Sequence, residues 1–473
     1  MNRILGYPLF LSVVALASTA LPQDRQPTNQ EARAVFKQLI EINTTESVGS
    51  VTKAAEAMAQ RLRDAGFSDQ DLIVAGPNER KKNLVVRLRG TGQKPPVLFI
   101  GHLDVVEARR EDWSMDPFKF IEQDGNFYGR GTRDMKAGDA ILVMSLMRLK
   151  RESYKPDRDL IVALTADEEA GDSNGIDWLV KQHRDWIDAE YCINLDGGEF
   201  ERLRGERGLA GLQASEKVYE DFQFETDNPG GHSSIPGPDN AIYELAAALG
   251  RLSKFSFPVR SNEITRGYFA QSAKFVSGPL ASDLRGAAEN PPNPSATQHL
   301  STIPYYNSLL RTTCVATMLS AGHAPNALPQ SARANVNCRI FPGEDPTQVL
   351  KTLERVVDDP GVKVAPVAEK TSDGKSIPVV AVPPSPLQPE LISALERTLA
   401  TMWSGMEVVP TMSTGATDGK YLRIAGIPTF GIACMFFDME DDRSHGKDER
   451  VGVQDFYDGV EFGYRFMKTL STN

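Results

Sequence analysis

Three consecutive carboxylates near the middle of the chain are the residues most suited to chemistry. Asp167, Glu168 and Glu169 lie in the sequence Thr-Ala-Asp-Glu-Glu-Ala-Gly at 165–171, directly after an apolar run at 160–164. Adjacent negative charges at the end of a buried strand repel one another and are costly to remove from water, so they need a positive partner. A divalent metal ion is one such partner, and an acidic loop on the solvated surface is the alternative interpretation. A metal site would require further ligands elsewhere in the chain.

Other residues of the metal-ligand type stand at the ends of predicted strands or just before a helix. They are His102 after the strand at 97–100, Asp196 after 192–195, His445 after 428–437, and Asp134 before a helix predicted from about 137 to 149. Taken singly, His102 could be a structural histidine and Asp134 part of an Asx turn. In an open α/β sheet, however, the loops at the carboxyl ends of the strands meet in one crevice. The combination therefore predicts a metal site.

The elements that position these residues follow an α/β pattern. Short apolar runs alternate with stretches of helical periodicity, which is typical of a sheet covered by helices on both faces. The predicted strands are 84–88, 97–100, 160–164, 192–195 and 428–437, and the predicted helices are 31–43, 52–65, 137–149, 389–403 and 453–470. We therefore expect a mixed-sheet α/β catalytic domain that is split in sequence, with its parts at 21–214 and 376–473.

A second domain is expected between these parts, at 215–375. Its strands and helices, at 218–226, 240–252, 313–319, 332–341 and 347–357, fit a βαββαβ order and a small α+β lid with one exposed sheet face. A segment rich in Pro, Asn and Ser, at about 258–310, interrupts this order. It is interpreted as a long functional or mobile loop that shapes the substrate pocket or the lid interface, or that alters a dimer formed through the lid.

The N-terminus and the charge limit the compartment and the partners. Residues 1–20 contain Arg3, an apolar run and small residues, which predicts a secretory signal peptide, with an uncleaved membrane anchor as the alternative. We therefore expect an exported, periplasmic or secreted protein without stable membrane insertion after processing. The formal net charge of −11 argues against nucleic acid as a partner.

The four cysteines form no CxxC pair. Buried free thiols are the favoured expectation, and Cys314 with Cys338 is the first disulfide to test.

Several motifs together resemble the M20 metallopeptidases, the group that contains carboxypeptidase G2, succinyl-diaminopimelate desuccinylase, acetylornithine deacetylase and aminoacylase-1. The matching stretches are GHLDVV at 101–106, GRGTRDMKAG at 129–138, TADEEAG at 165–171, NLDGG at 194–198, PGGHSSIP at 229–236, APNALP at 324–329 and SHGKDE at 444–449. They span nearly the whole chain after residue 20 in the expected order.

This resemblance implies a site with two divalent metal ions, most simply Zn²⁺ with Co²⁺ or Mn²⁺ as alternatives. Its implied ligands are His102 and Asp196 for one ion, Glu169 and His445 for the other, and Asp134 as a bridge between them. Glu168 resembles the general base that takes a proton from the attacking water. Asp104 is expected to orient His102 through the other imidazole N–H.

The resemblance also assigns residues of the inserted domain and beside the site. His232 resembles a histidine that reaches the active site of a neighbouring subunit, which implies a homodimer formed through the inserted domain. Arg339 matches an arginine that binds the substrate carboxylate, although Asn337 stands where the family commonly has Asp, which would loosen the orientation of Arg339. Asn326 is a further candidate for substrate contact. Asp418 and Glu449 are expected either at the rim of the site or directly behind the residues that form it.

The sequence thus predicts a hydrolase that cleaves an amide bond next to a free carboxylate, as a carboxypeptidase, a dipeptidase or an N-acyl-amino-acid deacylase. Its partners would be small peptides or N-acyl amino acids. One alternative is an M28-like aminopeptidase, which uses a similar ligand set but recognises a free amino terminus. Another is a binding protein on an inactive peptidase scaffold, against which the complete ligand set argues.

Overall fold

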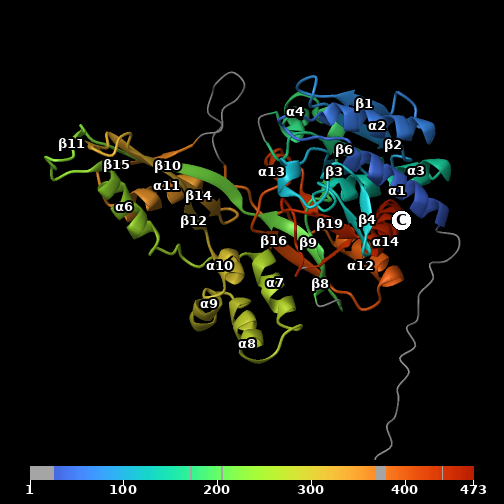
Figure 1. Ribbon diagram of the computed structural model, residues 1–473. Coiled ribbons are helices and arrows are strands. Elements are labelled where there is room, and N and C mark those ends of the chain that lie inside the picture. Colours follow the sequence, from blue (N-terminus) through green and yellow to red (C-terminus); the bar gives the residue numbers. More distant parts are fainter. Residues whose placement is uncertain (1–25, 171–172, 204–205, 368–379, 439, 473) are drawn as a thin grey trace, which may run out of the picture.

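The protein has two parts, which Figure 1 shows side by side and connected where the strand at 206–216 is followed by the strand at 218–227. The computed structural model describes residues 26–170, 173–203, 206–367, 380–438 and 440–472. The larger part is a mixed α/β structure and the smaller part is built on a separate four-stranded sheet. The predicted fold class is confirmed. The expected signal peptide at 1–20 and the expected domain boundary at 375 lie outside the described residues.

A ten-stranded mixed sheet organises the larger part. Its order is β1 (Leu72–Ala75), β2 (Asn83–Leu88), β6 (Leu160–Thr165), β3 (Val97–His102), β7 (Tyr191–Asn194), β17 (Thr429–Gly431), β9 (Glu206–Glu216), β8 (Phe200–Leu203) and β18 (Phe436–Asp438), with β16 (Val408–Ser413) paired to β9. β3 runs parallel to both β6 and β7, and β17 runs parallel to β7. The carboxyl ends of these central strands therefore lie at one edge of the sheet.

Helices cover both faces of this sheet, as the continuous apolar runs predict. One face carries α1 (Gln26–Glu41), α2 (Val51–Asp64), α3 (Lys136–Arg151), α12 (Pro389–Met402) and α14 (Val453–Leu470); the other carries α4 (Gly175–Gln182), α5 (Arg184–Ile187) and α13 (Gly419–Ile424). Successive side chains of a strand point to opposite faces. Leu84 and Val86 accordingly pack in the first core, and Val85 packs in the second.

The strand predicted over 428–437 is wrong in one respect, because the structure has two short strands there. β17 pairs with β7, whereas β18 pairs with β8. β7 and β8 are not adjacent in the sheet, so the chain must cross from one position in the sheet to another between β17 and β18. Cys434, between the two strands, has φ 63° and marks this step. An apolar run alone cannot show such a change of partner, since both short strands are buried.

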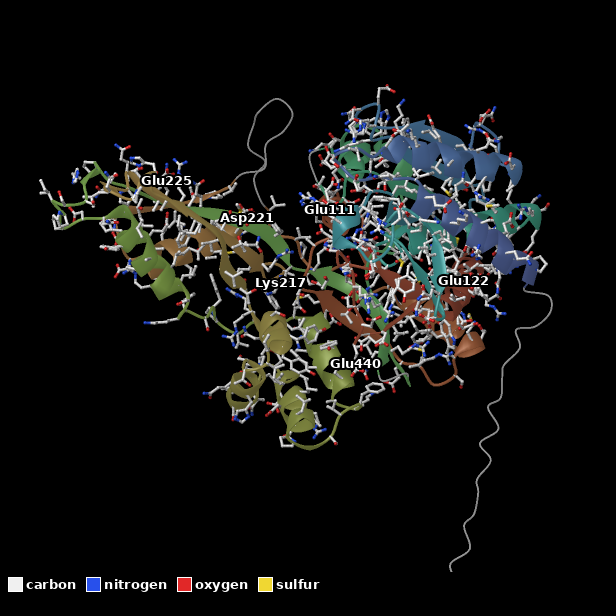
Figure 2. The ribbon with its side chains drawn as sticks, viewed as in Figure 1. Glu111, Glu122, Lys217, Asp221, Glu225 and Glu440 are labelled. Atoms are coloured by element: carbon white, nitrogen blue, oxygen red, sulfur yellow. A yellow bond between two sulfur atoms is a disulfide. The ribbon has the colours of Figure 1, made fainter. Side chains whose placement is uncertain are left out.

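The smaller part has the βαββαβ order that the sequence predicts. Its sheet order is β12 (Thr313–Ala321), β14 (Ser331–Ile340), β10 (Val218–Asp227) and β15 (Val362–Pro366), and α6 (Ala241–Leu252) and α11 (Pro346–Val357) cover one face. A two-stranded ribbon, β11 (Gly231–His232) with β13 (Ala327–Leu328), lies at its far end. β9 continues to Glu216, beyond the boundary expected at 214, and only Lys217 separates it from β10, at the junction labelled in Figure 2.

The segment at 258–310 is not the long loop that its composition suggests. It forms four short helices, α7 (Glu263–Ser272), α8 (Gly278–Ala287), α9 (Pro294–Leu300) and α10 (Pro304–Leu310). Asn262 and Asn293 cap two of them, and α8, α9 and α10 each have Pro in the first turn. Asn at the N-cap and Pro at the first position are helix-start signals. Residues of this helical insertion, including Ile264 and Phe269, pack into the core of the larger part.

The cysteines correct a further expectation. Cys314 and Cys338, directly opposite each other on β12 and β14, form a disulfide, so the expectation of free thiols is wrong for this pair. Cys192 and Cys434 are buried free thiols, as expected.

Two remaining elements are the 3₁₀ turn Arg110–Asp112 and a sheet of β4 (Ile121–Gln123), β5 (Asn126–Tyr128) and β19 (Arg450–Gly452). Among the described residues, none of the helices combines the length and the apolar character needed to cross a bilayer.

Candidate dinuclear metal centre

The five predicted metal ligands come together at the carboxyl edge of the central strands. His102 is the last residue of β3, Glu169 follows β6, and Asp196 follows β7. Asp134 lies just before α3, and His445 lies between β18 and β19. The convergence expected from the parallel strand arrangement is therefore present.

Asp134 stands between two imidazoles. Its Oδ1 is 3.1 Å from Nε2 of His102, and its Oδ2 is 3.0 Å from Nε2 of His445. The same His445 nitrogen is 2.9 Å from Oε1 of Glu169. His102, Asp134 and Asp196 form one group whose potential ligand atoms lie within 4.8 Å of one another, and Asp134, Glu169 and His445 form a second. Asp134 belongs to both groups, as a bridging ligand would.

The electrostatics of this cluster fit a cation. Burial raises the pKa of Asp196 well above its usual value, which shows the cost of holding this carboxylate without a counter-charge. Hydrogen bonds to Asp134 and Glu169 raise the pKa of His445 to about 10. This shift reflects the excess of negative charge around the His445 imidazole. Divalent ions would balance this charge, and the mixture of imidazole and carboxylate donors suits zinc, cobalt or manganese.

Asp104 contacts the cluster differently from the expectation. Nδ1 of His102 lies 3.1 Å from the main-chain carbonyl oxygen of Asp104 but 3.7 Å from its carboxylate, so the carbonyl is the acceptor. The Asp104 carboxylate instead accepts the main-chain N–H groups of Glu168 at 3.2 Å and Glu169 at 3.0 Å. Asp104 therefore positions both sides of the site, orienting His102 through its main chain and the two glutamates through its side chain.

Glu449 and Asp418 are buried next to the cluster and accept hydrogen bonds from the segments that carry its ligands. The buried Glu449 carboxylate accepts N–H groups from Gly131 at 3.1 Å, Arg133 at 2.7 Å and Asp134 at 3.0 Å, and so fixes the turn that presents Asp134. Asp418 accepts from Thr165 at 3.2 Å and Asn174 at 2.5 Å. Burial raises the pKa of Asp418 to about 6.

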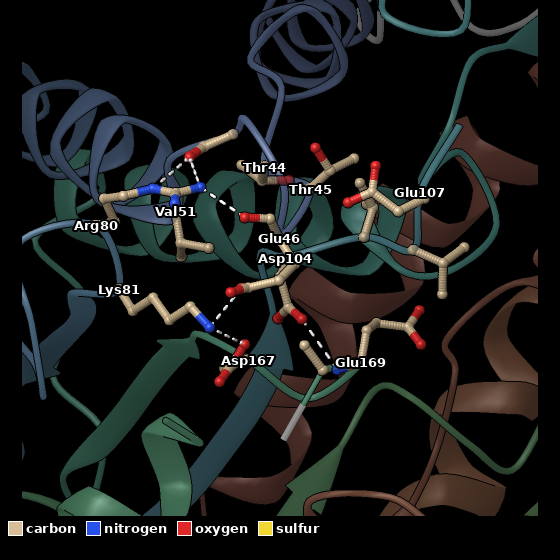
Figure 3. A pocket seen from close by; sticks show the side chains of 14 residues that line it. Thr44, Thr45, Glu46, Val51, Arg80, Lys81, Asp104, Glu107, Asp167 and Glu169 are labelled. Carbon is tan, nitrogen blue, oxygen red and sulfur yellow. Dashed lines mark hydrogen bonds and ion pairs between the residues drawn. The ribbon is translucent and has the colours of Figure 1, made fainter. Parts of the chain in front are cut away.

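Asp167, for which the sequence suggests a supporting position but no specific role, is buried and holds the loop that carries Glu168 and Glu169. Its φ of 66° turns the chain directly before Glu168. One carboxylate oxygen accepts from Nζ of Lys81 at 2.6 Å, and the other accepts the N–H of Ser173. Lys81 also contacts Glu46 at 2.5 Å, beside a cavity of about 280 Å³ (Figure 3). Sequence reasoning missed Lys81 because no periodicity or motif links residue 81 to residue 167.

Removing the Lys81 ammonium should disturb this loop. In a Lys81→Met variant the buried Asp167 loses its cation, and breaking such a pair costs about 3–5 kcal/mol. We expect turnover to fall at least about tenfold, because a small displacement of a catalytic group is costly, and Asp167→Asn should have less effect in this background than alone. Steady-state kinetics measure both effects.

The matched control is Lys82→Met, because Lys82 is adjacent but pairs with the exposed Glu79. Equal kinetics for the Lys81 and Lys82 variants would contradict the anchoring role. Strictly additive effects of Lys81→Met and Asp167→Asn would show that the lysine acts independently of Asp167.

Arg339 is the one predicted lid residue that lies beside the metal centre. It lines a cavity of about 350 Å³ together with Glu168, Glu169 and Asp418. Its guanidinium lies 4.6 Å from the ring centroid of Tyr219, and its Nε donates to the Asn337 side chain at 3.3 Å. Asn337 therefore orients Arg339 although it replaces the expected Asp.

His232 and Asn326 are not brought to the metal centre within this chain. His232 is on β11 and Asn326 just precedes β13, and both side chains are exposed. The ribbon that carries them lies at the end of the smaller part farthest from β3 and β6 (Figure 1). The two residues are neighbours, since the Ser233 N–H donates to the Asn326 carbonyl oxygen at 3.0 Å.

Comparison with known proteins identifies the family. Residues 98–469 match peptidase family M20/M25/M40. The chain belongs to this family. It is therefore a hydrolase of peptide or other amide bonds, and the resemblance seen in the sequence is confirmed. The M28-like alternative loses its support.

Two curated relatives and three solved structures illustrate the likeness. The chain is 27% identical over 388 residues to the mouse (Mus musculus) N-fatty-acyl-amino acid synthase/hydrolase PM20D1, covering 80% of this chain and 74% of that protein. It is 26% identical over 405 residues to a probable carboxypeptidase S-like 2 of Dictyostelium discoideum, covering 82% and 74%.

The solved structures share the fold at low sequence identity. An M20 metallo-carboxypeptidase of Sulfolobus solfataricus has a TM-score of 0.69 at 16% identity, covering 93% of this chain and 99% of that one. Human carnosine dipeptidase 1 has a TM-score of 0.66 at 16% identity, covering 95% and 98%. A Bacillus subtilis M20 peptidase described as dinuclear and metal-binding has a TM-score of 0.57 at 11% identity, covering 94% and 98%.

Proposed function

We propose that the protein is a dinuclear zinc hydrolase that cleaves an amide bond next to a free carboxylate, as a carboxypeptidase, dipeptidase or N-acyl-amino-acid deacylase. The observation that carries this proposal is the position of Arg339, which shares one cavity with Glu168 and Glu169. A guanidinium binds a carboxylate through two parallel hydrogen bonds. A substrate whose carboxylate lies on Arg339 would present the adjacent amide to the metal centre.

The residues present fit two metal ions. His102, Asp134 and Asp196 would hold one, and Asp134, Glu169 and His445 would hold the other. When bound, such ions polarise the amide carbonyl and lower the pKa of water. Zinc is the proposed metal, with cobalt and manganese as alternatives.

Glu168 is the proposed general base. Its main-chain N–H is fixed by Asp104, while its side chain lines the cavity shared with Arg339. Burial raises the pKa of its carboxyl group well above the usual value, which makes the carboxylate a stronger base. Glu168 would take a proton from the attacking water and donate it to the departing amine.

A homodimer formed through the smaller part is proposed on the basis of β12. This strand is at the edge of its sheet, and Val315, Met318 and Leu319 on it are exposed. An exposed apolar edge strand is suited to pairing with a second copy. His232 could then reach the site of the other subunit. A monomeric mass in light scattering would contradict this proposal.

Export to an oxidising compartment is proposed from the sequence pattern at 1–20 together with the Cys314–Cys338 disulfide. Fractionation of the producing cells tests it. Protein recovered only from the cytosol, with residues 1–20 still attached, would contradict export.

Substrate specificity tests the carboxylate requirement. A matrix of dipeptides and N-acyl amino acids, each with a free and an amidated carboxyl end, should show hydrolysis of the free acids. Amidation should lower kcat/KM by about tenfold or more, since one charge-assisted hydrogen-bonded contact is lost. Arg339→Met should reproduce this loss on the free acids and leave the amidated substrates unchanged. Equal rates for amidated and free substrates in the unmodified enzyme would overturn the proposed function.

A further inference from the structure

A second cavity opens on the metal centre from another side. Its volume is about 470 Å³, and Glu168, Glu169 and His445 line it. Glu168 and Glu169 also line the Arg339 cavity, so the two glutamates stand where the cavities meet. If the substrate carboxylate lies on Arg339, the acyl part beyond the scissile bond extends into this second cavity, which we name the acyl cavity.

The acyl cavity is lined by carboxylates in addition to those proposed to bind the metal ions. Glu199, Glu201 and Asp442 line it in addition to the carboxylates of the metal centre, and none of its described lining residues is a lysine or arginine. Arg133, beneath it, contacts Asp442 at 2.8 Å and Glu199 at 3.8 Å. Of the three additional carboxylates, Glu201 is the one that Arg133 does not contact.

An aromatic wall faces these carboxylates. Tyr305, at the start of α10, lines the acyl cavity, and 50% of its surface is exposed. Its ring packs near Tyr306 at 5.6 Å and Tyr268 at 6.4 Å between centroids. Tyrosine rings beside a carboxylate attract cations through the ring face as well as by charge.

We propose that the acyl cavity binds a positively charged group of the substrate, with Glu201 and Tyr305 as the residues that determine this specificity. The cation would be the free ammonium of an N-terminal residue or the basic side chain of that residue. This inference rests on the proposed function, because the direction of the substrate is set by its carboxylate on Arg339. A long alkyl chain would instead remove water from Glu199 and Glu201 without replacing their hydrogen bonds, which is unfavourable.

Four substrates with the same leaving group test the proposal. Glycyl-leucine carries an α-ammonium, Nα-acetyl-lysyl-leucine carries only a side-chain cation, N-acetyl-norleucyl-leucine is neutral, and N-lauroyl-leucine has a long alkyl chain. Release of leucine by the metal-loaded enzyme measures all four. We expect at least one cationic substrate to exceed the neutral peptide and the lauroyl compound about tenfold or more in kcat/KM, the scale of one charge-assisted contact.

Variants then assign the effect to the two residues. Glu201→Gln should reduce the preferred cationic substrate about tenfold and leave the neutral peptide nearly unchanged. Tyr305→Leu should cause a smaller loss in the same direction, because a cation–π contact is weaker. The matched control is Glu396→Gln on the exposed face of α12, which should change none of the rates.

The outcomes separate this inference from the function on which it rests. A preference for the lauroyl or neutral substrate would overturn the cation site and leave the proposed function standing. Equal losses on cationic and neutral substrates in Glu201→Gln would also overturn it, since they would show a structural role. Hydrolysis of none of the four would overturn the proposed function and the cation site together.

Discussion

Replacing Glu168 with glutamine should lower turnover by a factor of about 100 or more, the scale of the loss of a general base. Glutamine has the same shape but cannot accept the proton. The main-chain contact of residue 168 with Asp104 does not depend on its side chain, so the loop should keep its position. Both metal ions should therefore remain bound, because the two groups that share Asp134 do not include Glu168. Single-turnover kinetics together with metal analysis by mass spectrometry measure the effect.

The metal analysis makes this test specific. The ligand atoms of Glu168 also lie within 4.8 Å of those of His102 and Glu169, so a role as metal ligand is a competing interpretation. Loss of one ion in Glu168→Gln would support that role instead. Near-normal turnover with both ions bound would assign the proton transfer to another group. Glu396→Gln serves as the control for the substitution itself.

The clustering of the candidate metal ligands could be predicted from the sequence because several of them follow a simple structural rule. His102, Glu169 and Asp196 each come at or just after the carboxyl end of a buried strand, and parallel strands bring these ends together. The apolar runs that mark such strands are visible in the sequence alone. Asp134 and His445 also stand out in the sequence, but their loops are placed by Glu449 and by β19 rather than by a sheet edge, and only the family resemblance indicates which role each would have.

Other features could not be predicted, because they depend on contacts between distant residues. Lys81 and Asp167 form an ion pair between two loops that are far apart in the sequence. The apolar periodicity around either residue does not indicate this contact. The four helices of the insertion could not be recognised in the sequence, because Pro and Asn are common in loops but here begin short helices. Each helix is also too short to show a clear apolar periodicity. Glu201 and Tyr305 line one cavity because α7 of this insertion packs against β16, which pairs with β9 as β8 also does.

Asp134 has a position that no other residue of the cluster shares, and this has a measurable consequence. Its two oxygens face different imidazoles, so it would be the one carboxylate with an oxygen for each ion. Two ions held in this way would repel each other, and a carboxylate shared between them would offset that repulsion. Removing Asp134 should therefore affect both ions, whereas removing a ligand of one group should affect one.

Metal stoichiometry should follow this division. We expect two ions per chain in the unmodified protein, one in Asp196→Ala, one in Glu169→Ala and none in Asp134→Ala after dialysis against buffer without metal. Asp69→Ala is the matched control, because this aspartate is 82% exposed and pairs with Arg63 on the surface. Two ions in Asp134→Ala would show that the bridge is not required. Loss of both ions in Asp196→Ala would show instead that the two sites fill only together, and the assignment of separate ligand groups would then be wrong.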